Sequence, residues 1–181
     1  IEGSPYSPTG FYERQDDGTF AQVAQTAAGI LPWAIGDGDN DGRLDLLGSS
    51  LLRLRLLVGR VDSPFPRSAA LDQFQTWGGE IADLDGDGRN EIIARSGFER
   101  GLRIFRTDEG DTFYEAGTFT DPTSGGGDLG PRFVIADLDG DGQKEALVGD
   151  GDGDLWTCTM DAGGLLSATW ILEGDDDSDA R

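Results

Sequence analysis

Short apolar segments separated by turns rich in Gly, Ser and Asp recur along the chain. The clearest is Leu51–Val58, where Leu and Arg alternate with the period of two that is typical of a half-buried strand. Near the start, Gly10–Arg14 and Thr19–Ala24 flank Gln-Asp-Asp-Gly, a sequence that favours a β-hairpin. This pattern predicts a turn-rich, all-β protein.

Three segments of the chain align with one another without gaps: Ile35–Leu47, Ile81–Ile93 and Ile135–Leu147. Each contains Asp-x-Asp-x-Asp-Gly-x-x followed by Asp or Glu. Their first aspartates stand at positions 37, 83 and 137, which places them 46 and 54 residues apart. Blades of β-propellers repeat at roughly 40–50 residues, so duplication of one blade-sized unit explains the spacing.

Each aligned loop lies between two expected strands, and two further strands follow in the same repeat. The expected strands are Trp33–Ile35, Leu44–Leu47, Leu52–Val58 and a weaker one around Ala70–Phe74; then Gly79–Ala82, Glu91–Ala94, Gly101–Arg106 and Phe113–Thr118; then Phe133–Ala136, Glu145–Val148, Asp154–Thr159 and Ala168–Leu172. Four short strands per repeat are typical of a propeller blade.

The fold prediction is therefore a partial β-propeller of about three and a half four-stranded blades. Residues 1–29 are expected to supply the outer strands of an incomplete blade. The blades follow at 30–73, at 74–130 with a Gly-rich connection, and at 131–173, and residues 174–181 form an acidic tail that we expect to be disordered. Either the rest of a longer chain or further copies of this chain would complete the ring.

Composition narrows the list of partners. The 29 glycines and the hydrophobic content of 36% suit a turn-rich β protein better than a helical bundle. The net charge of −21 argues against nucleic acid and anionic membrane surfaces, because both require a basic patch. No apolar stretch is long enough to insert into a membrane. The single cysteine, Cys158, excludes an intrachain disulfide and is expected to be packed.

The acidic loops have the composition of calcium sites. Ca²⁺ takes six to eight oxygen ligands, and in a tight loop the acids at positions 1, 3 and 5 can face one ion. Position 7 would add a backbone carbonyl, position 9 a carboxylate, and Gly at position 6 the sharp turn. The predicted ligands are Asp37, Asp39, Asp41, the carbonyl of Arg43 and Asp45; Asp83, Asp85, Asp87, the carbonyl of Arg89 and Glu91; and Asp137, Asp139, Asp141, the carbonyl of Gln143 and Glu145.

Other metals and other loops fit less well. Mg²⁺ gives up its waters reluctantly, and Zn²⁺ prefers His and Cys, whereas the sequence has no histidine and one cysteine. An EF-hand requires Glu at position 12, where Gly48, Ala94 and Val148 stand, and helices in place of strands. Asp150–Asp154 also alternates acids but lacks the glycine at position 6 and the acid at position 9. We interpret it as a turn and keep a fourth site as the alternative.

The three loops with their flanking strands resemble FG-GAP/VCBS repeats, known from integrin α-chain propellers, bacterial extracellular proteins and some fungal lectins. The resemblance covers roughly residues 30–172. Trp77-Gly78 replaces the usual Phe-Gly, and no Gly-Ala-Pro follows the second strands, which places the chain nearer the bacterial members than the integrins. The resemblance implies a propeller of usually seven blades, calcium at blade loops, and binding or scaffolding more often than catalysis.

No enzymatic activity is expected, because the absence of histidine excludes a Ser-His-Asp or Cys-His arrangement. The first functional hypothesis is adhesion, ligand binding or scaffolding in an extracellular or cell-surface protein, with a protein or glycan ligand. A lectin-like propeller is the second, since Trp33, Trp77, Trp156 and Trp170 can stack on sugars, although packing within blades is favoured for the first three. An accessory domain of a secreted hydrolase or lyase is the third. The chain begins at Ile1 without Met or an apolar leader, so we expect a processed or excised piece without its secretion signal.

Overall fold

The computed structural model describes residues 8–26, 29–50, 53–60, 63–96, 101–108, 112–120, 133–149 and 153–172. These residues form strands, turns and bends, and none of them is helical. The strands are β1 (Gly10–Arg14), β2 (Phe20–Gln25), β3 (Leu31–Gly36), β4 (Asp45–Ser50), β5 (Arg53–Arg60), β6 (Ser63–Ala82), β7 (Glu91–Ser96), β8 (Gly101–Thr107), β9 (Phe113–Thr120), β10 (Phe133–Ala136), β11 (Glu145–Gly149), β12 (Leu155–Met160) and β13 (Leu166–Leu172).

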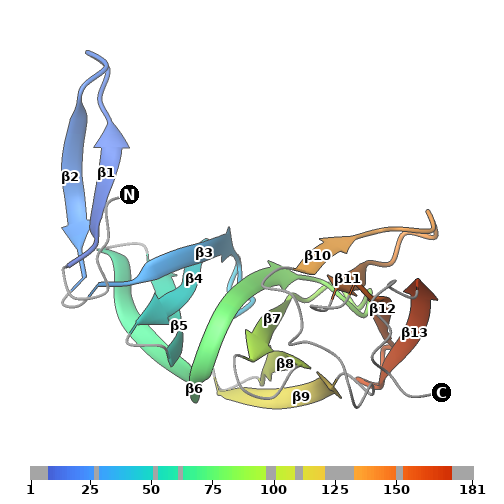
Figure 1. The fold of residues 1–181 in the computed structure, drawn as a ribbon. Coiled ribbons are helices and arrows are strands. Elements are labelled where there is room, and N and C mark those ends of the chain that lie inside the picture. Colours follow the sequence, from blue (N-terminus) through green and yellow to red (C-terminus); the bar gives the residue numbers. More distant parts are fainter. Residues whose placement is uncertain are drawn as a thin grey trace.

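The strands after the first hairpin form three antiparallel four-stranded units, which we call blades. Blade 1 consists of β3, β4, β5 and the first part of β6. Blade 2 consists of the last part of β6 with β7, β8 and β9, and blade 3 of β10 to β13. Within each blade, neighbours in sequence are neighbours in the sheet. The blades follow one another in an arc that is not closed into a ring (Figure 1).

Strand β6 differs from the expectation of two separate strands. It runs for 20 residues, pairing with β5 up to Gln75 and with β7 from Thr76 onward. One strand is therefore the outer edge of blade 1 and the inner edge of blade 2. Residues 69–77 contain neither Gly nor Pro, so no turn residue interrupts the extended backbone where the chain crosses between the blades.

The hydrophobic core lies between successive blades, and strand β7 shows how. Ile93 packs into a cluster with residues of blade 3, such as Val148 and Cys158. Its neighbour Ile92 points the other way and packs with residues of blade 1, such as Leu56. Because side chains alternate across a strand, the middle sheet is buried on both faces. Blades therefore stabilise one another by stacking face to face.

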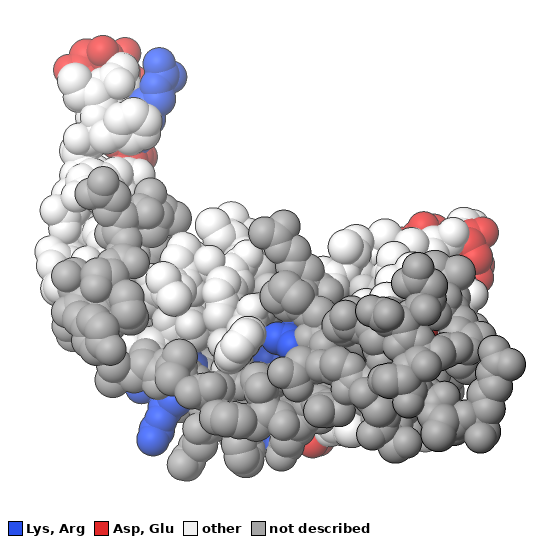
Figure 2. Space-filling model, viewed as in Figure 1, with Lys and Arg blue, Asp and Glu red and all other residues white. Residues whose placement is uncertain are grey.

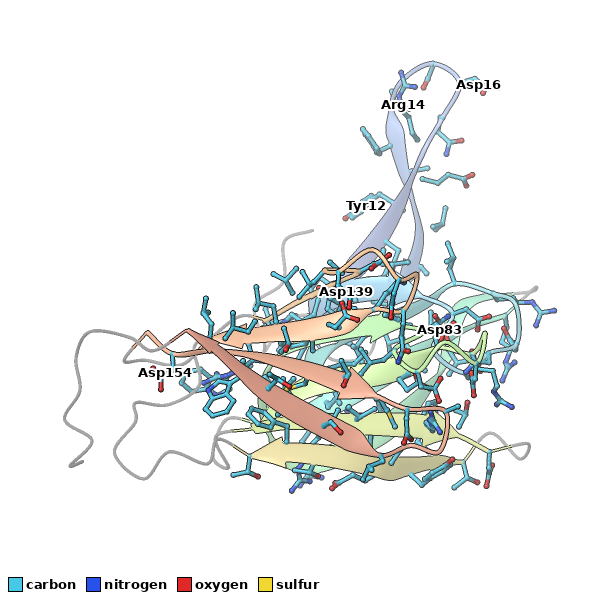
Figure 3. All side chains as sticks on the ribbon, turned by 90° about the vertical axis from the view of Figure 1, so that its right-hand side faces the viewer. Tyr12, Arg14, Asp16, Asp83, Asp139 and Asp154 are labelled. Carbon is cyan, nitrogen blue, oxygen red and sulfur yellow. The ribbon has the colours of Figure 1, made fainter. Side chains whose placement is uncertain are left out.

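Strands β1 and β2 form the expected hairpin, which projects from the blades as a separate two-stranded sheet (Figure 1). At its base, Thr9 exchanges hydrogen bonds with the backbone of Ile30, and Phe11 packs against the cluster of Ile30, Leu46 and Leu57. Farther out, Tyr12, Arg14 and Asp16 lie on the part that extends beyond the blades (Figure 3).

The all-β prediction is confirmed, and most expected strands are present with ends that differ by at most three residues. Among the described residues there is no helix, and hence none that could span a bilayer. The expected acidic tail and the Gly-rich connection at 121–130 lie outside the described residues.

Candidate metal centres

Each acidic loop joins two paired inner strands of one blade. The pairing ends at Gly36 with Asp45 in blade 1, at Ala82 with Glu91 in blade 2, and at Ala136 with Glu145 in blade 3. The acid at position 9 is therefore the first residue of the second strand, and positions 1 to 8 form the loop. Asp83 and Asp139 lie at the same end of the sheets, whereas Asp154 lies at the other end (Figure 3).

The three loops share one hydrogen-bond pattern. The carboxylate at position 1 accepts the N–H of the position-6 glycine, at 2.8 Å for Gly42, 3.0 Å for Gly88 and 3.1 Å for Gly142. The carboxylate at position 9 accepts the N–H of position 2, at 2.9, 2.8 and 2.8 Å. The repeated sequence thus encodes a repeated loop conformation.

The position-6 glycines are required by backbone conformation. Their φ angles are +85°, +87° and +94°, in the left-handed region that side chains disfavour. A Cβ atom added at any of the three would meet nothing within 4 Å, so space is not the constraint. This confirms that a sharp turn occurs where the sequence predicts it.

Carboxylates converge in all three loops. In each case three side chains contribute oxygens that lie within 4.8 Å of one another. The groups are Asp37, Asp39 and Asp41 in the first loop; Asp83, Asp85 and Glu91 in the second; and Asp137, Asp139 and Glu145 in the third. Each group can hold a metal ion, since clustered carboxylate oxygens are ligands of hard cations.

Position 9 differs between the loops because Asp is one methylene shorter than Glu. Asp45 is fully buried and uses both oxygens on the backbone: Oδ2 accepts the N–H groups of Gly38 and Asp39 at 2.9 and 3.1 Å, and Oδ1 accepts that of Gly59 at 2.8 Å. Glu91 and Glu145 bind one loop N–H each with Oε2, and both belong to the oxygen clusters.

The remaining predicted ligands lie in the loops without joining these groups. Asp87 and Asp141 accept the backbone N–H groups of Arg89 and Gln143, both at 2.8 Å. The roles of the carbonyls of Arg43, Arg89 and Gln143, and of Asp45, Asp87 and Asp141, as ligands stay predictions. Of the alternative acidic stretch, residues 150–152 lie outside the described part of the chain.

Crowding and burial disfavour the charged form of several loop acids. Burial, together with the nearby charges of Asp45 and Asp41, raises the pKa of Asp39 to about 6. Burial likewise raises the pKa of Glu91 to about 7, with Asp87 and Asp83 adding to the rise. Burial also raises the pKa of Asp45. In these groups the loss of water on burial outweighs the stabilisation of the charged form by neighbouring donors and cations.

One buried oxygen provides a direct test of whether the first loop fits a cation. Oδ2 of Asp39 is buried and has no hydrogen-bond donor among the described residues, and the nearest ion-pairing nitrogen, on Arg60, is 4.0 Å away. An unpaired buried carboxylate oxygen is costly. A cation among Asp37, Asp39 and Asp41 would supply the missing partner, so the residues fit a metal.

Positive side chains reach two of the three clusters. In the first loop, Arg43 and Arg60 pair with Asp41 at 2.9 and 2.8 Å. In the second, Arg106 pairs with both Asp85 and Glu91. Within the described part of the chain, no Lys or Arg forms an ion pair with the third cluster. Figure 2 shows acidic side chains exposed around the β10–β11 turn that carries this cluster.

Side chains also connect the first loop to the second. Asn40 accepts the N–H of Asn90 at 2.6 Å and donates to its carbonyl at 3.1 Å, and Asn90 donates to the carbonyl of Asp37 at 2.9 Å. The sequence pattern did not predict this bridge or the arginine pairs. Asn at positions 4 and 8 of neighbouring loops is the signal that could have indicated the bridge.

The tryptophans have different surroundings. Trp156 is buried against Phe119, and Trp33 packs beside the cluster between blades 1 and 2, as expected. Trp77 is 55% exposed, with the Arg95 guanidinium 5.5 Å from the centre of its ring, so the packing prediction fails there. The side chain of Trp170 lies outside the described part. Cys158 is fully buried, as predicted, and burial raises its pKa to about 12.

Comparison with known proteins agrees with this geometry. Residues 83–148 match the model of the FG-GAP-like repeat, a segment that extends from the first ligand position of the second loop to the strand after the third. No curated protein and no solved structure matches the chain. FG-GAP repeats form propellers, which agrees with the blade arrangement. Residues 83–148 are therefore similar to an FG-GAP-like repeat, and the described residues form an all-β, propeller-type fold.

Proposed function

We propose that this chain is a calcium-stabilised propeller-type domain that serves adhesion, ligand binding or scaffolding in an extracellular protein. The observation that carries the proposal is the threefold loop: one backbone conformation, repeated in each blade, that gathers three carboxylates. Without a cation such loops contain buried like charges whose pKa values are raised. Binding of an ion converts this repulsion into attraction.

The donor set favours calcium. All clustered donors are carboxylate oxygens, and the chain has no histidine. Ca²⁺ accepts an irregular set of six to eight oxygens, whereas Mg²⁺ requires a near-ideal octahedron and keeps its waters. Extracellular calcium modules bind in the range of about 10⁻⁴ to 10⁻³ M, which suits a permanently filled structural site in a calcium-rich environment.

A non-catalytic role agrees with the positions of the acids. The carboxylates at position 9 accept backbone N–H groups, and burial raises the pKa of the Cys158 thiol to about 12. The ions would hold the turn between the two inner strands of each blade. We propose that the partner is a protein or a glycan, bound on a surface that these turns keep rigid.

Calcium is expected to raise the melting temperature of the chain. A ligand that binds only the folded state at about 100 times its Kd stabilises by about 2.7 kcal/mol, which is about 5–10 °C for a domain of this size. Differential scanning calorimetry of metal-free protein with and without CaCl₂ measures the shift, and MgCl₂ at the same concentration is the control. Equal melting temperatures in all three buffers, with no heat of binding in a calorimetric titration, would refute the calcium proposal.

The stability of the metal-free protein and the stability that calcium adds should depend on pH with opposite signs. The pKa values of Asp39 and Glu91 are about 6 and about 7 in the folded chain, above their ordinary values of 3.8 and 4.5. At a pH between the ordinary and the raised pKa of each group, the folded state binds more protons than the unfolded state. Metal-free protein therefore gains stability as the pH falls from about 8 to about 5.

Calcium requires the same groups to be ionised, so the calcium-dependent rise in melting temperature should shrink over that range. Melting curves of metal-free and calcium-loaded protein at several pH values test both signs. A metal-free protein that becomes more stable as the pH rises would contradict the first.

One observation favours glycan binding as a second candidate. A groove of 510 Å³ lies along the inner strands β3, β6 and β10, lined by Trp33 and Phe133 with Glu80 beside them. Aromatic rings with a nearby carboxylate are a common surface for stacking and hydrogen bonding to sugars. Calcium-dependent binding on a glycan array that is lost in Trp33→Ala would favour this role, and an array without hits would favour a protein partner.

A further inference from the structure

Arg106 of strand β8 lies at the second acidic loop. Its Nε donates to Oε1 of Glu91 at 3.0 Å, and its Nη2 pairs with Oδ2 of Asp85. Both carboxylates are almost completely buried, and both belong to the oxygen cluster of this loop. Their other oxygens accept backbone N–H groups, from Asp87 and Leu84. The guanidinium thus neutralises the oxygens that the loop backbone leaves free.

The other two repeats do not place a cation in this way. In blade 2, Ile92 pairs with Phe105, so Arg106 lies across from Glu91. The same register in blades 1 and 3 places Val58 and Thr159 at that position. Arg60 at the first loop reaches Asp41 but stays 4.0 Å from Asp39. Among the described residues, Arg106 hydrogen-bonds two carboxylates of the second cluster, whereas Arg60 hydrogen-bonds Asp41 of the first cluster and only reaches ion-pair distance of Asp39.

A small cavity adjoins this ion pair. It measures 110 Å³, and its lining includes Glu91, Arg106 and Tyr114. Tyr114 lies across from Arg106 in the β8–β9 register and is about half exposed. The Arg106 side chain, which is 16% exposed, therefore has space beside it into which the guanidinium can move.

We propose that Arg106 is the resident cation of the second loop, and that a divalent ion binds there only by displacing its guanidinium toward this cavity. A guanidinium and a divalent ion cannot share the same two carboxylates without strong repulsion. The second loop then binds calcium more weakly than the third, whose carboxylates pair with no Lys or Arg among the described residues, and it keeps its conformation without metal. This inference rests on the proposed metal binding and adds the residue that sets the affinity of one site.

Calorimetric titration of metal-free protein with CaCl₂ tests the inference. Arg106→Gln removes the competing charge, and one binding event should strengthen about tenfold or more, since tenfold in affinity is a small part of a buried ion-pair energy. Arg103→Gln is the matched control: it lies on the same strand, loses the same charge and pairs with Glu115. The control should change affinity by less than about twofold.

Two further variants assign the effect. Adding Asp85→Asn to Arg106→Gln should abolish the strengthened event, which places it at the second loop. Arg106→Lys, which keeps the charge but cannot bind both carboxylates as a fork, should give an intermediate gain and serves if the Gln variant does not fold. The melting temperature of metal-free Arg106→Gln should fall below that of the native chain, while its rise on adding calcium should be larger.

The outcomes separate the two proposals. If the native chain shows no calcium binding at all, the proposed function fails. If it binds calcium but Arg106→Gln leaves every event unchanged or weakens one, the function stands and the inference is overturned. An equal gain in Arg106→Gln and Arg103→Gln would also overturn it, because the effect would then be one of net charge.

Discussion

Replacing Asp45 by Ala is expected to lower the free energy of unfolding by about 3–5 kcal/mol, measured by urea denaturation of metal-free protein. The side chain is fully buried and accepts three backbone N–H groups, from Gly38, Asp39 and Gly59. Each donor left without a partner in the interior costs about 1–3 kcal/mol. The loss does not require a metal, since the bonds organise the loop itself.

Two controls bracket this prediction. Asp45→Asn keeps one carbonyl acceptor and should lose less than Asp45→Ala. Asp16→Ala removes one exposed charge at the tip of the hairpin and should change stability by less than about 0.5 kcal/mol. A loss below about 1 kcal/mol for Asp45→Ala would show that the loop N–H groups find other partners, and that Asp45 does not hold the turn.

Ile104→Ala should cost about 2–5 kcal/mol, the range for removing most of a large buried aliphatic side chain. Ile104 is fully buried in the cluster that contains Ile93 of blade 2 together with Val148 and Met160 of blade 3. The cavity would open between two sheets, so both blades should be destabilised together.

Urea denaturation monitored by tryptophan fluorescence measures this loss. Val23→Ala on the hairpin, where the side chain is 47% exposed, is the matched truncation control and should cost much less. If blade 3 unfolds in Ile104→Ala at a lower urea concentration while blade 2 keeps its native midpoint, the blades do not share a core in the way that the cluster implies.

Most of the repeat could be predicted from the sequence because its determinants are local. The Asp-x-Asp-x-Asp-Gly spacing predicts a tight turn, since Gly42, Gly88 and Gly142 adopt a conformation that other residues disfavour. Apolar segments on both sides predict the flanking strands, and the hairpin at Gly10–Arg14 follows from its turn residues. These features depend on a few neighbouring residues and need no knowledge of distant contacts.

The composition of each carboxylate cluster depended on the tertiary structure. The nine-residue loop pattern suggested the same ligand positions in all three loops. In the structure, however, both carboxylate oxygens of Asp45 accept backbone N–H groups, including that of Gly59 on the next strand. Glu91 and Glu145 are longer and join the other acids. Whether a carboxylate faces the loop centre is decided by side-chain length and by donors that sequence spacing does not locate.

The sequence by itself determined the strands, the turns and the three acidic loops that recur in register. Only the tertiary structure decided that β6 belongs to two blades, that Asn40 and Asn90 connect two loops, and that Arg106 lies between Asp85 and Glu91. The physical reason is distance along the chain. Turn and strand preferences act over a few residues, whereas these contacts join residues brought together only when the blades pack.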